Sequence, residues 1–215
     1  MKKTLIVFTR YPEPGKTKTR LIPVLGAEGA ANLHRQMAEY AIAQAKQLTS
    51  SHQVSVEVHF TGGNLNLMRS WLGNDIIYQP QIEGDIGLKM SAAFKAAFNQ
   101  NINYVSIIGS DCPKLNYQLI SQAFDSLLQH DLVIGPATDG GYYLIGLSRF
   151  IPELFKGINW STAEVFQQTI EIAARLNLSV AYLPKLSDID RPEDLAILDF
   201  RFSIEQPRSQ MTNEP

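Results

Sequence analysis

The feature that most constrains the fold is a regular exchange of short apolar runs with longer amphipathic segments. Apolar runs at residues 4–9, 53–60, 76–78, 104–111, 132–137, 141–147 and 179–184 predict strands. Residues 26–48, 66–72, 87–100, 116–129, 161–176 and 191–200 predict helices, with Ser161 or Thr162 as the N-cap of the fifth. Strands that alternate with helices predict one α/β domain, a three-layer α/β/α sandwich with a mostly parallel sheet. We expect this domain to span residues 1–204 and a flexible tail to span 205–215.

Composition excludes several classes of protein. The 215 residues are 45% hydrophobic and 19% charged, which suits a chain with a sizeable core. A net charge of -2 gives no positive field for nucleic acid. Cys112 is the only cysteine, which rules out a disulfide within the chain and predicts a cytoplasmic location. The first apolar run is too short for a signal peptide, and no run approaches the roughly 18 apolar residues of a membrane span.

A basic loop, "RYPEPGKTKTR" (residues 10–20), follows the first predicted strand. Its "GKT" matches the end of a P-loop, but the glycine required five positions before Gly15 is an arginine. Pro12 and Pro14 remove backbone donors, and Pro23 stands where the following helix would start. We therefore expect the cations to bind an anion through their side chains; a solvated charged run is the alternative.

Two acidic segments follow other strands of the predicted sheet. Asp111 ends a buried strand, at the edge where ligands bind in such sheets, and its carboxylate suits a divalent cation. Its alternative role is the N-cap of the helix near Asn116. Asp188 and Asp190 straddle an isoleucine, so an extended backbone would point both the same way; helix capping or pairing with the next arginine is the alternative. With the basic loop, these acids predict a magnesium and phosphate site.

Two glycine-containing stretches add candidate contacts. "QPQIEGDIGLKM" (79–90) places Gly84 and Gly87 around Asp85 just before a helix, whose first amides can bind an anion. An ordinary turn with Asp85 as a cap explains the same residues. "PATDGGYYLIGL" (136–147) has a double glycine that a hairpin turn explains, and Asp139 and Tyr142 beside it could touch an acceptor.

Six stretches together resemble the nucleotide-diphospho-sugar transferase superfamily (the GT-A fold). They are "FTRYPEPGKTKTRL", "EGDIGLKM", "IIGSDCPKL", "GPATDGGYYLIGL", "NWSTAEVF" and "SDIDRPEDL", spread over residues 8–195. Within the superfamily the chain is most similar to a small bacterial transferase family linked by name to arsenosugar biosynthesis. The 2-phospholactate guanylyltransferases and the molybdenum-cofactor nucleotidyltransferases are related families. The chain departs from the nucleotidyltransferases in lacking their glycine-rich opening, and from typical glycosyltransferases in having one aspartate, in "GSDCP", where they carry D-x-D.

The resemblance implies a GT-A-like (Rossmann-like) transferase that uses Mg²⁺ or Mn²⁺, a nucleotide sugar or nucleoside triphosphate as donor, and a small-molecule acceptor. The preferred reaction is glycosyl transfer. The alternatives are nucleotidyl transfer with release of pyrophosphate and a non-catalytic nucleotide-binding module. The resemblance leaves open whether the protein forms a homo-oligomer. The predicted catalytic residues are Asp111, Lys18, Arg20 and Asp139. The predicted nucleotide contacts are Arg10, Lys16, Lys18, Thr19, Arg20, Gly84, Asp85 and Gly87. The predicted acceptor contacts are Asp139, Gly140, Gly141, Tyr142 and Trp160, and the predicted metal ligands are Asp111 with Asp188 or Asp190.

Overall fold

The fold is taken from a computed structural model, which describes residues 1–52, 54–199 and 201–202. The strands are β1 (Lys3–Arg10), β2 (Val54–Thr61), β3 (Ile77–Pro80), β4 (Tyr104–Gly109), β5 (Leu132–Pro136), β6 (Tyr142–Leu147) and β7 (Val180–Tyr182). The α-helices are α1 (Ile22–His52), α2 (Leu65–Leu72), α3 (Ile86–Asn99), α4 (Tyr117–Ser126) and α5 (Val165–Arg175). Three 3₁₀ helices, η1 (Thr19–Leu21), η2 (Pro152–Phe155) and η3 (Pro192–Ile197), complete the described elements.

All seven strands form one sheet in the order β3-β2-β1-β4-β6-β5-β7. Strands β3, β2, β1 and β4 are parallel to one another, and β6 runs antiparallel to both of its neighbours. The chain moves outward from β1 to β3 and then returns to add β4 on the other side of β1. This reversal makes the carboxyl ends of β1 and β4 the switch point at which such sheets bind ligands.

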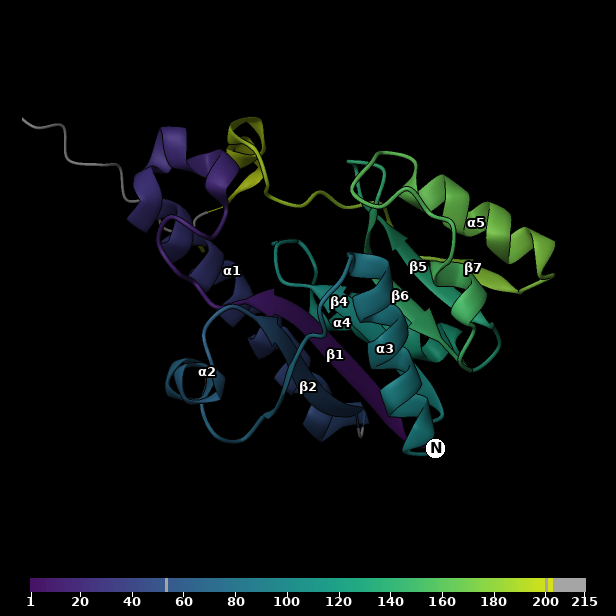
Figure 1. Cartoon of the computed structure of the whole chain (residues 1–215). Coiled ribbons are helices and arrows are strands. Elements are labelled where there is room, and N and C mark those ends of the chain that lie inside the picture. The colour runs from purple at the N-terminus through teal and green to yellow at the C-terminus, as the bar shows by residue number, and fades with distance from the viewer. Residues whose placement is uncertain (53, 200, 203–215) are drawn as a thin grey trace, which may run out of the picture.

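Two apolar cores cover the two faces of the sheet. Alternate residues of β1 divide between them, because successive side chains of a strand point to opposite faces: Leu5 joins one core and Ile6 the other. Residues of α1, α2 and α4 pack on the first face, and residues of α3, η2 and α5 pack on the second (Figure 1). The predicted three-layer α/β/α sandwich with a mostly parallel sheet is therefore confirmed.

The C-terminal segment returns from β7 to the start of the chain. Ile189 and Phe202 are buried against Leu21, Leu25 and neighbouring residues in a third, smaller core. The backbone N–H of Ile189 donates to the carbonyl of Asp111 at 2.9 Å. In Figure 1 this yellow segment crosses from the β5 side of the sheet to the first turns of α1. It thereby brings the residues around Ile189 to the carboxyl end of β4.

Three local predictions need correction. Pro23 does not prevent a helix there: it lies in the first turn of α1, where a backbone N–H has no partner within the helix, and the chain bends at Gly26 instead. The fifth helix begins at Val165, after a turn, so neither Ser161 nor Thr162 caps it. The last predicted helix is the short 3₁₀ helix η3 rather than an α-helix.

Some predictions fall outside what the structure describes. The predicted tail at 205–215 lies outside the described residues, as does the boundary at 204. Among the helices of the described ranges, none combines the length and apolar character that crossing a membrane requires.

Candidate active site

The loop after β1 folds around a buried threonine. Thr17 is only 2% exposed; its hydroxyl donates to the carbonyl of Tyr11 at 3.2 Å and accepts from the N–H of Glu13 at 3.1 Å. The next residue, Lys18, has a left-handed backbone with φ 48°. That conformation is costly for a residue with a side chain, and it persists only where surrounding contacts hold it. Here it accompanies a side chain that is buried, with 7% exposure.

Lys18 and Arg20 meet acids from two distant parts of the chain. The Lys18 ammonium lies 2.8 Å from Oδ2 of Asp111 and 3.7 Å from Oδ1 of Asp190. The Arg20 guanidinium pairs with the other oxygen of Asp190. The segments after β1, β4 and β7 therefore converge, as their positions at the ends of strands led us to expect.

Charge rather than burial decides the protonation of this cluster. Burial by itself would lower the pKa of Lys18, but the charge and hydrogen bond of Asp111 outweigh it and raise the pKa. Burial would likewise raise the pKa of Asp111, yet the Lys18 ammonium holds it below its ordinary range. At neutral pH the pair is an ammonium facing a carboxylate.

Asp188 makes no ion pair with any residue that the structure describes. Burial, followed by the charges of Asp111 and Asp139, raises the pKa of Asp188 to about 6. The positive charge of Lys18 lowers this pKa, but its effect is weaker than those of burial, Asp111 and Asp139. The negative charges of Asp111 and Asp139 thus act on Asp188, and a bound cation would relieve this repulsion.

Other residues cap the helices that Asp111, Asp188 and Asp190 could have capped. Asn116 accepts from the N–H of Leu119 at 3.0 Å and caps α4, so Asp111 does not. Asp194 accepts from the N–H groups of Asp190 and Arg191 at 3.0 and 2.7 Å at the start of η3. The carboxylates of Asp111 and Asp188 are therefore left to face the interior of the site.

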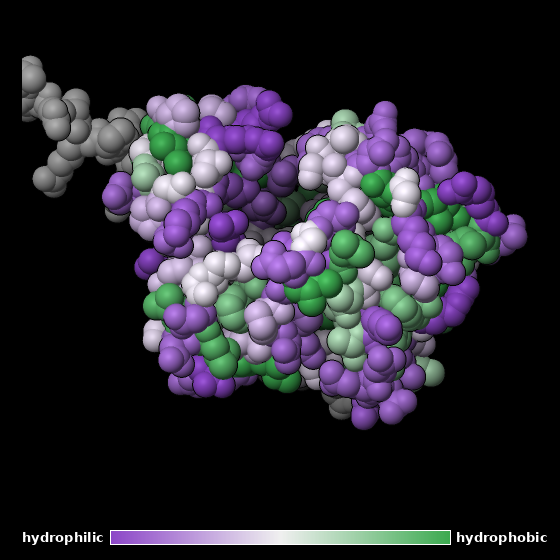
Figure 2. All heavy atoms as spheres, in the orientation of Figure 1, coloured by the Kyte–Doolittle hydropathy of each residue, from purple (hydrophilic) through white to green (hydrophobic). Residues whose placement is uncertain are grey.

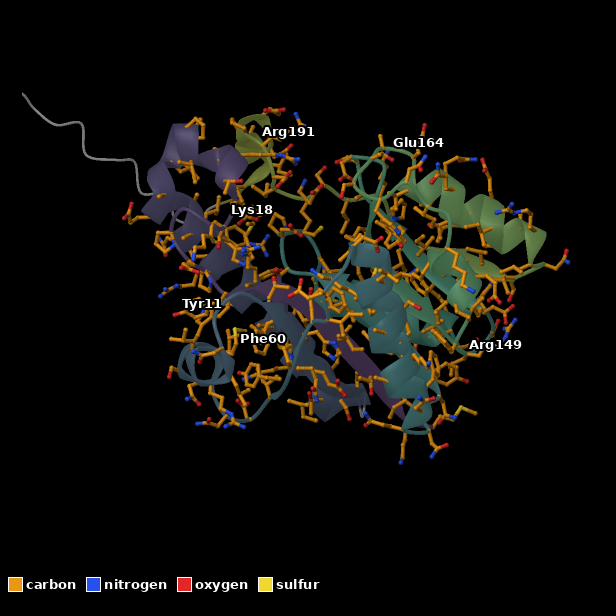
Figure 3. The ribbon with its side chains drawn as sticks, in the orientation of Figure 1. Tyr11, Lys18, Phe60, Arg149, Glu164 and Arg191 are labelled. Atoms are coloured by element: carbon orange, nitrogen blue, oxygen red, sulfur yellow. The ribbon has the colours of Figure 1, made fainter. Side chains whose placement is uncertain are left out.

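These groups border a cavity of about 840 Å³, large enough for a nucleotide-sized ligand. Figure 2 shows the molecule hollowed between two lobes, and Figure 3 places Lys18 and Arg191 on one side of the gap and Glu164 on the other. The lining of the cavity is partly ionic and partly apolar. The ionic lining includes Arg20, Asp111, Asp139, Asp188, Asp190, Arg191 and Asp194; the apolar lining includes Ile86, Met90, Tyr142, Trp160 and Val165.

A buried polar layer supports the cavity floor. Nε2–H of His34 donates to the carbonyl of Arg10 at 2.9 Å, and burial lowers the pKa of His34, so its ring is neutral. The hydroxyl of Ser110 donates to that of Thr9 at 3.0 Å, which links the end of β1 to the end of β4. These bonds fix the two loops that carry Lys18 and Asp111 relative to each other.

The structure brings only some of the predicted residues to the cavity. Arg20, Asp111, Asp139, Gly141, Tyr142, Trp160, Asp188 and Asp190 line it. Lys18 lies directly behind Asp111 and Asp190, and Gly140 is in the turn beside Gly141. Gly87 contributes indirectly, because Trp160 packs on it.

Other predicted nucleotide contacts lie outside the cavity lining: Arg10, Lys16, Thr19, Gly84 and Asp85. Lys16 is exposed and pairs with Glu13 at 2.8 Å. Oδ1 of Asp85 accepts from the N–H of Leu88 at 2.8 Å and caps α3, which is the alternative role considered for it. A nucleotide contact from any of these five residues stays a prediction.

Arg191 is the main residue that the sequence analysis did not place in the site. It lines the cavity and makes no ion pair with any other residue in the described ranges. The sequence motif "DIDRP" left it as a partner for the neighbouring acids, yet Asp190 is already paired with Lys18 and Arg20. Arg191 does not pair with Asp190 because Lys18 and Arg20 already do, and the local sequence does not reveal those distant contacts.

Solved structures similar to this one belong to nucleotide-using transferases. A candidate nucleotide-diphospho-sugar transferase from Desulfovibrio desulfuricans G20 is 36% identical, with a TM-score of 0.81 over 89% of this chain and 84% of that one. A 4-diphosphocytidyl-2C-methyl-D-erythritol synthase from Anaerococcus prevotii DSM 20548 is 11% identical, with a TM-score of 0.60 over 91% and 93% of the two chains. An inositol-1-phosphate CTP transferase from T. maritima is 12% identical, with a TM-score of 0.56 over 90% and 91%. The last two similarities concern the fold alone.

The fold, together with the 36%-identical relative, places this chain among the transferases. A family described as "Uncharacterized protein conserved in bacteria (DUF2064)" matches residues 44–162, more than half of the chain. The chain therefore belongs to the DUF2064 family. No curated protein matches it at a significant level.

Proposed function

We propose that this protein transfers a glycosyl group from a nucleotide sugar to a small acceptor. One observation carries the proposal: Lys18 and Arg20 pair with Asp111 and Asp190 at a large cavity that Asp188 also lines. The name of the relative from Desulfovibrio desulfuricans supports a nucleotide sugar as the donor. The cavity lies at the switch point of the sheet, where folds of this kind bind their ligands.

The basic groups would hold the diphosphate of the donor. The side chain of Arg20 is 63% exposed, and its planar guanidinium can bind two phosphate oxygens at once. Lys18 adds a buried positive charge next to Asp111 and Asp190. In the reaction the bond between the anomeric carbon and the phosphate oxygen breaks, and its electron pair stays with the departing nucleoside diphosphate. Fixed cations next to that diphosphate stabilise the charge that develops on it.

The acceptor would approach from the other side of the cavity. Oδ1 of Asp139 accepts from the N–H of Gly141 at 2.8 Å, which orients the carboxylate at the cavity wall. Its second oxygen can accept a hydrogen bond from the attacking hydroxyl, whose oxygen forms the new bond to the anomeric carbon and whose proton passes to water. We therefore assign Asp139 the orientation of the acceptor hydroxyl.

The acids also fit a divalent cation. Within the described residues, no three or more acidic, histidine or cysteine side chains form a ready-made metal cluster. Mg²⁺ commonly needs only one or two carboxylates and completes its shell with phosphate and water. We assign this role to Asp111 and Asp188, because both carboxylate oxygens of Asp190 are paired, with Lys18 and Arg20, whereas Asp111 is paired through Oδ2 alone. When bound, Mg²⁺ or Mn²⁺ would neutralise negative charge on the phosphate oxygens.

The test supplies the protein with Mn²⁺ or Mg²⁺, a set of nucleotide sugars and small hydroxyl acceptors, and measures released nucleoside diphosphate by chromatography. We expect release that depends on both metal and acceptor and is lost in Asp111→Asn. Asp125→Asn, an exposed position on α4 outside the cavity, is the matched control and should retain activity.

Two other outcomes would replace the proposal. Pyrophosphate released from a nucleoside triphosphate, with no turnover of any nucleotide sugar, would show nucleotidyl transfer. Metal-dependent nucleotide binding with no turnover over the whole set would show a non-catalytic binding module.

A further inference from the structure

Two glycines allow one wall of the cavity to pack closely against neighbouring elements. A Cβ atom on Gly87, in the first turn of α3, would lie 2.2 Å from the ring of Trp160. A Cβ atom on Gly140, in the turn between β5 and β6, would lie 2.1 Å from the carbonyl oxygen of Ala163. The backbone of Gly140 also accepts from the N–H of Phe166 at 2.9 Å. Residues 160–163, here called the Trp160 wall, are therefore seated against two separate elements.

The Trp160 wall is also fixed from within. The hydroxyl of Thr162 donates to the carbonyl of Asn159 at 2.7 Å, and the N–H of Asn159 donates to the side chain of Gln168 at 2.8 Å. Ser161 has a left-handed backbone with φ 64°. A conformation of this kind costs on the order of 1 kcal/mol or more in a residue with a side chain and clusters at functional sites. The wall is thus a built structure rather than a loose loop.

Trp160 packs in an apolar cluster that includes Met90, Tyr142 and Val165. Ile86, Met90, Tyr142 and Val165 line the cavity with it. The hydroxyl of Tyr142 is buried, so this residue presents ring carbons to the cavity. Glu164, at the end of the wall, lies across the gap from Lys18 and Arg191 (Figure 3). The adjoining Trp160 wall is therefore placed to meet a part of the substrate other than the phosphates that those cations would bind.

We infer that the Trp160 wall is an acceptor subsite that takes the flat apolar face of a ring, with Trp160 as the specificity-determining residue. The inference rests on the proposed function, because Asp139, whose charge acts on Asp188, directly precedes Gly140, on which Ala163 of the wall packs. An indole ring binds flat apolar faces by stacking, and a small number of polar groups beside it fixes orientation. An aromatic ring and the C–H face of a saturated sugar ring share this chemistry.

The chain offers a direct optical test, since it has only two tryptophans. Trp71 donates its indole N–H to Glu39 at 2.7 Å, away from the cavity. In Trp71→Phe, Trp160 is the sole source of indole emission. We would titrate this variant with phenol as the aromatic probe, methyl glucopyranoside as the saturated-ring probe, and glycerol as an open-chain probe. We expect saturable quenching of Trp160 by at least one ring probe and none by glycerol.

Two further variants supply the controls. Trp160→Phe keeps a ring in the wall and leaves Trp71 as the reporter, whose emission should not respond to any probe. In Trp160→Ala the affinity for the responding ring probe, measured by ligand-observed NMR, should fall about 2- to 12-fold, the equivalent of an aromatic pair worth about 0.5–1.5 kcal/mol.

Nucleotide binding in the presence of Mn²⁺, measured by calorimetry on the same variants, separates the two proposals. If nucleotides bind but neither ring probe alters Trp160 emission, the acceptor subsite is refuted and the proposed function stands. If a ring probe quenches Trp160 but no nucleotide binds, the proposed function is refuted and its acceptor site with it. If all three probes quench Trp160 equally, the wall does not select rings and the inference is refuted.

Discussion

Replacing Gly87 by alanine tests whether the contact with Trp160 is as close as the structure shows. The new Cβ would lie 2.2 Å from an indole carbon, whereas ordinary carbon contacts lie at about 3.5–4.0 Å. One of the two elements must therefore move by more than about 1 Å. The indole cannot move freely, because the wall that carries it is held at Gly140 and Asn159.

The magnitude follows from two opposing effects. Overpacking of a rigid contact costs about 1–3 kcal/mol, whereas alanine in place of glycine in a helix gains about 0.4–1 kcal/mol. Gly87→Ala should therefore destabilise the protein by about 1–2 kcal/mol. In a Trp160→Ala background the steric cost disappears, and the same change should stabilise by about 0.4–1 kcal/mol.

The assay is urea unfolding followed by far-UV circular dichroism, which does not depend on the tryptophan signal. The four proteins of the cycle give the coupling energy between the two positions, expected to be about 1–3 kcal/mol. An effect of Gly87→Ala that has the same sign and size in both backgrounds would refute the contact, and with it the account of how the Trp160 wall is positioned.

Three further predictions concern charged groups. Lys18→Met should destabilise the protein by about 1–3 kcal/mol, less than the loss of a fully buried pair, because the side chain of Asp111 is 39% exposed. Added Mn²⁺ should restore much of this loss, measured by thermal unfolding. The control Lys46→Met should change stability by less than about 0.5 kcal/mol. Arg191→Ala should weaken nucleotide binding in calorimetry by about tenfold, a change of about 1.4 kcal/mol, without altering the melting temperature; an unchanged affinity would remove Arg191 from the site. The backbone N–H of Ser179, its hydroxyl and Arg149 lower the pKa of Asp131, so its contribution is present at neutral pH and is lost as pH falls below about 4. Asp131→Asn should therefore cost about 1 kcal/mol in urea unfolding at pH 7 and progressively less below pH 4, and a difference independent of pH would contradict this.

The order and type of most elements could be predicted from the sequence, because they depend on local patterns. The apolar run around Ile6 and the amphipathic spacing of 116–129 predict β1 and α4, and the structure contains both. Asp111 was selected for its place after a buried strand, and it lies in the cavity. Such predictions succeed because burial periodicity is written in neighbouring residues.

Errors arose where a local rule met a contact made by distant residues. Ser161 has the composition of an N-cap, but its segment is held as a turn by Gly87 and Gly140, so the helix starts four residues later. Lys16 and Lys18 are equivalent in the sequence pattern, yet one is exposed beside Glu13 and the other is buried against Asp111. Only the fold of the loop around Thr17 separates them.

By itself the sequence determined an α/β sheet, the strands that end in charged residues, and the kinds of group available for a phosphate and a cation. Packing of the chain established which of those groups meet: Lys18 pairs with Asp111, and Trp160 lies on Gly87. Asp188 and Arg191 are left without an ion pair to any described residue. The physical reason is that strand and helix periodicity acts over a few residues. Ion pairing, burial and steric contact depend on segments more than 70 residues apart, such as Gly87 and Trp160, that only the packed sheet brings together.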